Sequence, residues 1–384
     1  MDDRKFDIPV LNILSLGLDE AGKTVFLSAL YNKFSVYNPS YGFSLQCEDE
    51  SQKYYLTAMY NRISRPETDW PAGSMQHTEY VFNALHPTKD GSITFCKFNY
   101  LDYFGAAMRG AGDFKDVALE KRVREAHSIL VLLDGRKIRL ALEGKTIDDD
   151  IFKDLSYILP FLNLIIGTDK PVHFLISKSD LLPGGNKQLS DIQDLLFGYR
   201  PFKDYIKAQK HYETMVRMIP ISSVGFEFAK LTEDGTEVQK ISGGSINPHN
   251  VQFALSLAIH DHFWRASQKQ HEHVKKLIDD SKMVLALMEA ARVAPRYLLP
   301  RIKNVPSIIF WRRSGKFALT KILENIDQYL EQRQMARQSR VDLMQSAVTN
   351  RREAFLESLA VQREMVANLD KFMPGNNLAK YLES

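Results

Sequence analysis

The chain has 384 residues, which is long enough for two domains or for one domain with a large appendage. Hydrophobic residues make up 44% of it, as expected for a globular protein with a real core. Its two cysteines, Cys47 and Cys96, are too few for a disulfide scaffold, and no apolar signal-peptide core follows the charged N-terminus. No apolar run reaches the roughly 18 residues of a membrane span. We therefore expect a cytoplasmic protein without a transmembrane segment.

The formal net charge of +3 hides an asymmetry. The stretch Arg292–Arg352 contains thirteen Lys or Arg and four Asp or Glu, a local charge of +9, so the rest of the chain carries −6. A basic stretch of this kind can face lipid headgroups at a membrane surface, nucleic acid or an acidic protein. A solvated helical face that binds nothing is the alternative, and the count is equally consistent with it.

The first motif lies between an expected buried strand, Val10–Leu16, and an expected helix, Val25–Tyr31. Gly17–Thr24 reads G-L-D-E-A-G-K-T and fits the phosphate-binding pattern G-x-x-x-x-G-K-[ST] in the strand–loop–helix context that its chemistry needs. Backbone N–H groups of such a loop enclose phosphates, and the helix N-terminus adds a favourable dipole. Lys23 would reach the β- and γ-phosphates, and the Thr24 hydroxyl would ligate Mg²⁺. The candidate nucleotide-binding residues of this loop are Gly17, Asp19, Glu20, Ala21, Gly22, Lys23, Thr24 and Val25.

The next segments are interpreted from their periodicity. Apolar residues at helical spacing predict a helix at Asp49–Ile63, and Pro and Gly predict a loop at Pro66–Ser74. Two strands, Tyr80–Leu85 and Ile93–Leu101, are expected to pair across a hairpin near Asp90-Gly91. The second of these strands ends in D-x-x-G at Asp102–Gly105, where the Asp would hold Mg²⁺ through water and the Gly N–H would meet the γ-phosphate.

Two later strands also end in polar residues. Val172–Ile176 is followed by S-K-S-D at Ser177–Asp180, which resembles the guanine-recognition motif [NT]-K-x-D. A fixed carboxylate at Asp180 would accept two hydrogen bonds from the N1–H and N2–H₂ edge of guanine, which adenine cannot supply. Met218–Gly225 contains a loop similar to the one that touches guanine O6 through a backbone N–H. The candidate base-binding residues are Ser177, Lys178, Asp180, Ser222 and Ser223.

The remaining elements of this part predict the fold class. Ser128–Gly135 is expected to be a buried strand, and residues 148–167 and 187–211 are expected to be helices. Alternating strands and helices imply an α/β fold with a mostly parallel, doubly wound sheet, which binds ligands at the carboxyl ends of its strands. All the motifs lie at such ends.

These motifs together resemble those of the Ras-like, TRAFAC-class small GTPases over about residues 8–265. Gly17–Thr24 is especially similar to the loop of the ADP-ribosylation-factor branch, and the layout is also similar to bacterial GTPases of the double-GTPase type. The resemblance implies a P-loop GTPase domain that binds GTP or GDP with Mg²⁺. It also implies that Lys23 takes part in catalysis, and that Asp102 and Gly105 take part in metal and phosphate binding.

Compared with compact members of that family, the interval from Lys23 to Asp102 is long, and the excess gives an enlarged switch region at about residues 32–78. A hydroxyl ligand for Mg²⁺ is expected shortly before Tyr80. Either Thr78 or Ser74 can supply it, and the spacing does not decide between them, although threonine is the family's residue.

The residue after Gly105 departs from the family pattern. Ras-like and Arf-like proteins carry a glutamine there, which orients the attacking water, whereas this chain has Ala106. Alanine cannot orient water, so we expect slow intrinsic hydrolysis unless a partner or another residue supplies the missing group. Arg109 could stabilise developing charge, and the alternative is that it is an ordinary exposed switch residue.

The last third of the chain is expected to be helical. Apolar residues at helical spacing predict a helix over Val251–Ala294 and, after three prolines, a long helix from about Ser314 to Met373 with an imperfect coiled-coil pattern. Thr232–Pro248 is expected to be a loop. The predicted domains are therefore a GTPase domain at residues 1–265 and a helical appendage at residues 266–384.

The sequence favours a guanine-nucleotide switch whose state is read by the C-terminal helices or by a protein partner that contacts them and the switch loops. A nucleic-acid partner is not favoured. One alternative is a nucleotide-binding scaffold, a pseudo-GTPase that barely turns over, which Ala106 favours. Another is a dynamin-like mechanochemical GTPase whose helices form a stalk.

Overall fold

The structure is a computed structural model, and two compact units are recognised in it. The first unit comprises residues 1–265 and 351–384, and the second comprises residues 266–350. The second unit lies outside the described residues, apart from the first turn of a C-terminal helix. The structure describes residues 8–73, 76–89, 91–103, 105–110, 117–145, 150–183, 188–233, 235, 237–263 and 348–382.

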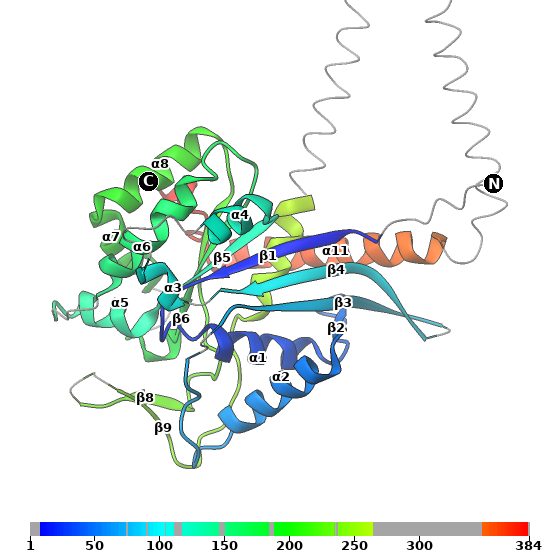
Figure 1. The fold of residues 1–384 in the computed structure, drawn as a ribbon, viewed down its shortest axis with the longest axis horizontal. Helices are drawn as coiled ribbons and strands as arrows, with labels where there is room; N and C mark the ends of the chain where they lie inside the picture. The colour runs from blue at the N-terminus through cyan, green and yellow to red at the C-terminus, as the bar shows by residue number, and fades with distance from the viewer. Residues whose placement is uncertain are drawn as a thin grey trace, which may run out of the picture. The chain divides into compact units, whose positions relative to one another are not determined.

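A seven-stranded sheet in the order β2–β3–β4–β1–β5–β6–β7 forms the centre of the first unit (Figure 1). β4, β1, β5, β6 and β7 run parallel to one another, and β3 is antiparallel to both of its neighbours. The expected α/β fold with a mostly parallel sheet is therefore confirmed. The strands are β1 (Val10–Leu16), β2 (Ser44–Cys47), β3 (Thr78–Thr88), β4 (Gly91–Asp102), β5 (Ser128–Asp134), β6 (Val172–Ser177) and β7 (Val216–Pro220).

Helices cover both faces of the sheet, so most side chains of the parallel strands are buried and apolar (Figure 1). Side chains alternate between two cores: Leu11 and Ile13 of β1 enter one, and Leu14 and Leu16 enter the other. α1, α2, α11 and the helical residues 252–263 pack on the first core, and α3 to α8 with α12 pack on the second. The helices are α1 (Lys23–Phe34), α2 (Glu50–Ile63), α3 (Gly105–Gly110), α4 (Val117–Glu125), α5 (Gly135–Leu142), α6 (Ile151–Asn163), α7 (Gln188–Gly198), α8 (Arg200–His211), α11 (Val348–Phe372) and α12 (Leu378–Tyr381).

The enlarged segment after α1 contributes a helix and a hairpin. α2 begins after Asp49, whose carboxylate accepts a hydrogen bond from the Gln52 N–H at 2.9 Å, and so the helix expected there is confirmed. The expected hairpin also forms, with β3 and β4 longer than the apolar pattern indicated. Both strands extend past the buried part of the sheet, where half-exposed side chains no longer show the alternation.

The loop expected at Thr232–Pro248 is only partly a loop. A short strand, β9 (Val238–Lys240), pairs there with β8 (Ala229–Leu231) in a separate two-stranded sheet. The sequence prediction was wrong at this point because strands of three residues are too short to show a period of two. This hairpin matters for the site, because Ala229 and Val238 line the same cavity as residues of the Gly17–Thr24 and Ser177–Asp180 motifs.

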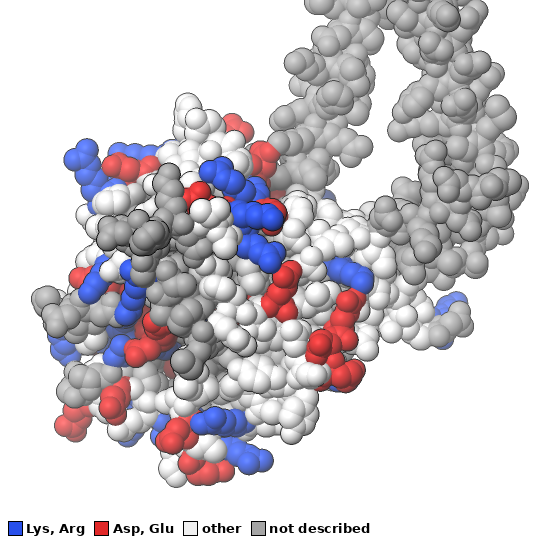
Figure 2. Space-filling model, in the orientation of Figure 1, with Lys and Arg blue, Asp and Glu red and all other residues white. Residues whose placement is uncertain are grey.

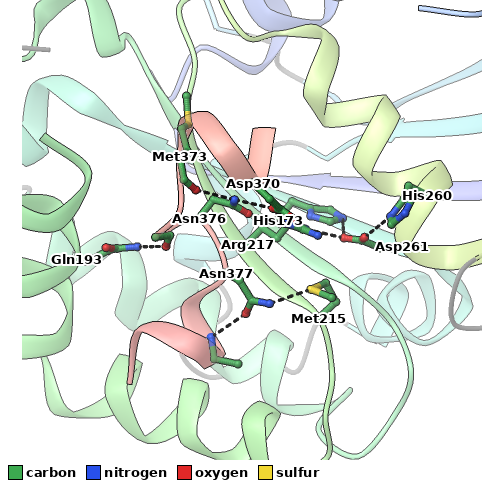
Figure 3. A network of polar contacts seen from close by, with 12 residues as sticks. His173, Gln193, Met215, Arg217, His260, Asp261, Asp370, Met373, Asn376 and Asn377 are labelled. Atoms are coloured by element: carbon green, nitrogen blue, oxygen red, sulfur yellow. Dashed lines mark hydrogen bonds and ion pairs between the residues drawn. The ribbon is translucent and has the colours of Figure 1, made fainter. Parts of the chain in front are cut away.

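Residues near the C-terminus belong to the first unit and are held there by Arg217 of β7 (Figure 3). The buried Arg217 guanidinium donates hydrogen bonds to Asp261, at 3.1 Å, and to Asp370 of α11, at 2.7 Å. The Asn376 carbonyl accepts a further bond from the Met218 N–H at 2.8 Å. One arginine thus connects the helix that leaves this unit with the helix that returns to it.

Apolar packing reinforces this attachment. Val366 and Leu369 of α11 are buried in the first core, and Leu378 of α12 is buried in the second. The domain division therefore differs from the expected one at residue 265, because residues 351–384 belong to the first unit. The continuous helical pattern of Ser314–Met373 gives no sign of where the chain returns to the core, and residues 314–347 lie outside the described part.

The described residues contain no helix that is long and apolar enough to cross a membrane. Basic and acidic side chains are interspersed on the face shown in Figure 2. The basic stretch Arg292–Arg352, with its predicted acidic or membrane contact, lies outside the described side chains.

Candidate functional site

The phosphate-binding loop connects β1 to α1 and is shaped by backbone conformations that few residues adopt. Gly22, at the N-cap of α1, has a φ of 80°, which suits glycine because it has no Cβ. Glu20 has a φ of 66°, one of four positive φ values at non-glycine residues in the described part of the chain. Such strained positions gather at ligand sites, where the backbone must aim its N–H groups at a bound molecule.

Lys23 lies buried beneath this loop. Its Nζ donates hydrogen bonds to the carbonyl oxygens of Gly17, at 2.7 Å, and Leu18, at 3.3 Å. Burial lowers the pKa of Lys23, while the nearby carboxylates of Asp102 and Asp19 act in the opposite direction. The structure thus keeps an ammonium group at the loop, held by backbone oxygens that a phosphate could replace.

Asp102 is placed at the carboxyl end of β4, opposite Ser15 of β1. Burial raises its pKa to about 6, and the Lys23 charge and a hydrogen bond from Thr24 oppose this rise. Its Oδ1 is buried and accepts no hydrogen bond from any described residue. A buried carboxylate oxygen without a donor is unfavourable by itself, and a hard cation such as Mg²⁺ would satisfy it.

Gly105 brings the D-x-x-G segment against the phosphate-binding loop. A Cβ at this position would lie 2.6 Å from the Leu18 carbonyl carbon and 2.7 Å from the Asp19 nitrogen. No side chain fits into that space, so glycine is required for the close approach. The two motifs are therefore adjacent in space, as the resemblance implied.

The expected switch hydroxyl remains a choice between two residues, but the strand register bears on it. Thr78 is the first residue of β3 and pairs directly with Asp102. Opposite residues of an antiparallel pair share a face of the sheet, which puts Thr78 on the Asp102 side. Ser74 lies outside the described residues.

The base-recognition motif follows β6. Lys178 has a φ of 51° and begins the short 3₁₀ turn Ser179–Leu181 that contains Asp180. Burial raises the pKa of Asp180, and a hydrogen bond from Ser222 opposes this rise. The Oδ1 atom of Asp180 is buried and has no hydrogen-bond donor among the described residues. The loop thus holds a carboxylate with one oxygen that lacks a donor, as a guanine edge would require.

Asp134, which the sequence reasoning missed, organises this end of the site from the end of β5. Its carboxylate accepts hydrogen bonds from Lys178 Nζ at 2.9 Å and from the Arg136 N–H at 2.8 Å. Arg136 in turn donates to Glu20 of the phosphate-binding loop at 3.1 Å. The only signal in the sequence was the Asp at a strand end, Asp134-Gly135, before a helix.

A cavity of about 750 Å³ is lined by residues of both the phosphate-binding loop and the S-K-S-D loop. Its size is within the range of small-molecule sites. Trp70, Arg136, Leu181, Val224 and Val238 also line it, and the sequence reasoning named none of them as site residues. Of the expected residues, those lining it are Asp19, Glu20, Gly22, Lys23, Thr24, Val25, Ser177, Lys178, Asp180 and Ser223.

The other expected residues lie around the cavity or away from it. Gly17 and Ala21 are buried within the phosphate-binding loop, and Ser222 is buried behind the cavity, where it accepts a hydrogen bond from the Gly225 N–H at 2.7 Å. Arg109 lies in α3, which follows D-x-x-G, and it does not line the described cavity. Ala106 is the second residue of the same helix.

Comparisons with known proteins give little beyond the fold. No family model matches the sequence, and no curated protein is significantly similar to it. Among solved structures, the chain is similar to a signal recognition particle receptor SRb-GTP/SRX complex from Chaetomium thermophilum, with 16% sequence identity and a TM-score of 0.34. That match covers 56% of this chain and 94% of the other. A likeness of this size carries no functional argument.

Proposed function

We propose that this chain binds GTP and GDP with Mg²⁺ in the cavity between the phosphate-binding loop and the S-K-S-D loop. The observation that carries the proposal is the convergence of Lys23, Thr24 and Asp180 on one cavity, although they come from distant parts of the sequence. A chance match to the phosphate-binding pattern would not bring a buried carboxylate to the far end of the same cavity.

The residues present fit both parts of the ligand. Lys23 and the backbone N–H groups of Asp19–Val25 would bind phosphate, and Asp180 would accept from the guanine edge. The Thr24 hydroxyl and the donor-free Oδ1 of Asp102 offer the oxygen ligands that Mg²⁺ prefers, with Thr78 as the third candidate. When bound, Mg²⁺ would neutralise phosphate charge, and the protein residues would fix the orientation of the nucleotide.

Asp180→Asn tests the base assignment. An amide can donate a hydrogen bond where the carboxylate only accepts, so the variant should bind GTP more weakly and xanthosine triphosphate more tightly than the unmodified chain does. Isothermal titration with both nucleotides measures this exchange. Asp191→Asn is a suitable control because Asp191 is exposed on α7, outside the cavity. Unchanged base preference in Asp180→Asn would contradict the assignment.

We further propose that GTP hydrolysis by the isolated chain is slow, or depends on a partner. Ala106, directly after Gly105, supports this, because it cannot orient a water molecule. A group supplied by a partner can raise such rates by roughly 10³- to 10⁵-fold. A pseudo-GTPase scaffold is the second candidate function. Single-turnover hydrolysis, measured with and without a stimulating partner, separates the two, and fast turnover by the lone chain would contradict both.

We also propose that the C-terminal helices or a protein partner read the nucleotide state. Arg217 supports this, since it ties the helix at residues 252–263 and α11 to β7, a neighbour of the strand that carries the S-K-S-D loop. Removing residues 266–350 while joining the two helices should leave nucleotide binding intact and abolish the partner-dependent response.

A further inference from the structure

Two segments on the guanine side of the cavity are fastened to each other. We call them the clasp: residues 65–73, which follow α2, and the paired strands β8 and β9 at residues 229–231 and 238–240. The indole N–H of Trp70 donates a hydrogen bond to the Val238 carbonyl at 2.7 Å. The Trp70 ring also meets the Phe228 ring edge-on, with 6.3 Å between centroids. The switch-region insertion is thus attached to a hairpin, with 168 positions between Trp70 and Val238.

Lys240 of β9 joins the two segments of the clasp. Its ammonium group lies 4.9 Å from the centre of the Trp70 ring, the geometry of a cation–π contact. The same group donates hydrogen bonds to the Arg65 carbonyl at 2.9 Å and to the Thr68 hydroxyl at 3.0 Å. The Lys240 side chain therefore contacts three residues of the opposite segment, namely Arg65, Thr68 and Trp70.

Both segments of the clasp contribute residues to the lining of the cavity. Trp70 and Gly73 line the cavity from one segment, and Ala229 and Val238 line it from the other. Trp70 and Val238 also pack on a small apolar cluster that includes Leu181, next to Asp180 in the chain. The clasp is therefore an apolar wall at the guanine end of the site.

We propose that the clasp controls how fast a bound guanine nucleotide leaves, with Trp70 as a positioning residue that packs against the base or ribose. This inference rests on the proposed nucleotide binding. An apolar wall excludes water from the base edge, and nucleotide release through this side requires the Trp70 and Lys240 contacts to open. The clasp should not alter the preference for guanine, because the contacts of Lys240 are made within the protein and do not involve Asp180.

Tryptophan fluorescence reports on the position of Trp70. The chain has three tryptophans, Trp70, Trp264 and Trp311. Saturation of the full chain with GDP and Mg²⁺ should change the tryptophan emission, and Trp70→Phe should lose that change while it still binds GDP. A change of the same size in Trp70→Phe would show that the signal comes from another tryptophan and would contradict contact between Trp70 and the nucleotide.

The dissociation rate tests control by the clasp. The full chain is loaded with N-methylanthraniloyl-GDP and chased with excess GDP in a stopped-flow instrument. Trp70→Ala and Lys240→Gln should each raise the dissociation rate about tenfold or more, because mutations at binding surfaces act mainly on release. Both variants should keep the preference for GDP over ADP. Lys230→Gln, at an exposed position on the same hairpin, is the control and should leave the rate unchanged.

The outcomes separate this inference from the proposed function. If the unmodified chain binds no N-methylanthraniloyl-GDP, the proposed function and this inference fail together. If it binds and Trp70→Ala releases the nucleotide at the unmodified rate, this inference alone is wrong. Faster release in Trp70→Ala and Lys240→Gln with guanine preference retained supports it.

Discussion

Two clusters of buried charge at this sheet differ in how their charged groups are paired. Around Arg217, the guanidinium meets Asp261, Asp370 and the Asn376 side chain, so its charge is compensated within the protein. At the candidate site, one oxygen of Asp180, which lines the cavity, and one oxygen of Asp102, next to the phosphate-binding loop, have no donor among the described residues. The first cluster holds the chain together, and the second is where we propose a ligand.

Buried charges that are paired within the protein anchor elements, whereas a buried carboxylate oxygen without a donor costs free energy that a ligand can repay. Removing a buried charge should therefore destabilise the ligand-free chain at Arg217 and stabilise it at Asp102. Four predictions test this, taken from the largest expected effect to the smallest.

Arg217→Leu should lower the free energy of unfolding by about 3–5 kcal/mol, because it leaves the buried Asp261 carboxylate without its cation. Urea denaturation of the full chain, followed by circular dichroism, measures the loss. Arg200→Leu removes an exposed ion pair with Asp204 and should cost less than about 1 kcal/mol. Equal costs in the two variants would show that Arg217 does not anchor the C-terminal residues.

His173, beside Asp261, should make the fold sensitive to acid. Burial lowers the pKa of His173 to about 4; the Asp261 carboxylate opposes this, and the charges of Arg217 and His260 reinforce it. The unfolded chain therefore binds a proton near pH 6.5 that the folded chain refuses until about pH 4, so stability falls as the pH drops through this interval. The loss attributable to His173 is on the order of 3 kcal/mol.

His173→Leu should flatten this dependence. The measurement is the urea midpoint at several pH values between 7 and about 4, compared between the variant and the unmodified chain. His262 also has a pKa lowered to about 4 by burial, so part of the slope should remain. An unchanged slope in His173→Leu would mean that this histidine does not titrate as its burial indicates.

Lys23→Ala should weaken GTP binding roughly 10- to 150-fold, the effect of losing charge-assisted hydrogen bonds worth about 1.5–3 kcal/mol. The fold should survive, because Lys23 bonds only to backbone oxygens of its own loop. Titration calorimetry measures the affinity, and circular dichroism checks the fold. Lys33→Ala, at the end of the same helix, removes a lysine outside the cavity and serves as the control. GTP affinity that is unaffected by Lys23→Ala would refute the phosphate site.

Asp102→Asn should stabilise the ligand-free chain, by about 1–2 kcal/mol, because it replaces a buried carboxylate, one of whose oxygens lacks a donor, with a neutral amide. The same change should abolish the dependence of GTP affinity on Mg²⁺. Thermal unfolding without nucleotide and titration at low and high Mg²⁺ measure the two effects. A loss of stability like that of Arg217→Leu would place Asp102 with the structural cluster instead.

Much of the fold was predictable because its strands and helices carry strong periodic signals. The strand Val10–Leu16, the helix at Asp49–Ile63 and the hairpin before Asp102 appear where the sequence placed them. The order of the motifs also indicated that the phosphate-binding loop, D-x-x-G and S-K-S-D meet at one edge of the sheet. This edge can be predicted because parallel strands all end on the same side of the sheet.

What the sequence could not reveal depends on contacts between distant segments. Trp70 was visible only as part of a Pro- and Gly-containing loop, and nothing in the sequence links it to Lys240. Arg217 occupies a position in β7 where an apolar residue would be expected, and only the structure shows its partners Asp261 and Asp370. The return of α11 to the sheet was missed for the same reason.

Equilibrium titration of the unmodified full chain with GTP and with ATP, both with Mg²⁺, tests the central claim most directly. A cavity that contains a carboxylate with one donor-free oxygen should bind GTP at least ~100-fold more tightly than ATP, because adenine leaves that oxygen unpaired. Equal affinity for the two nucleotides, or no binding of either, would contradict the account.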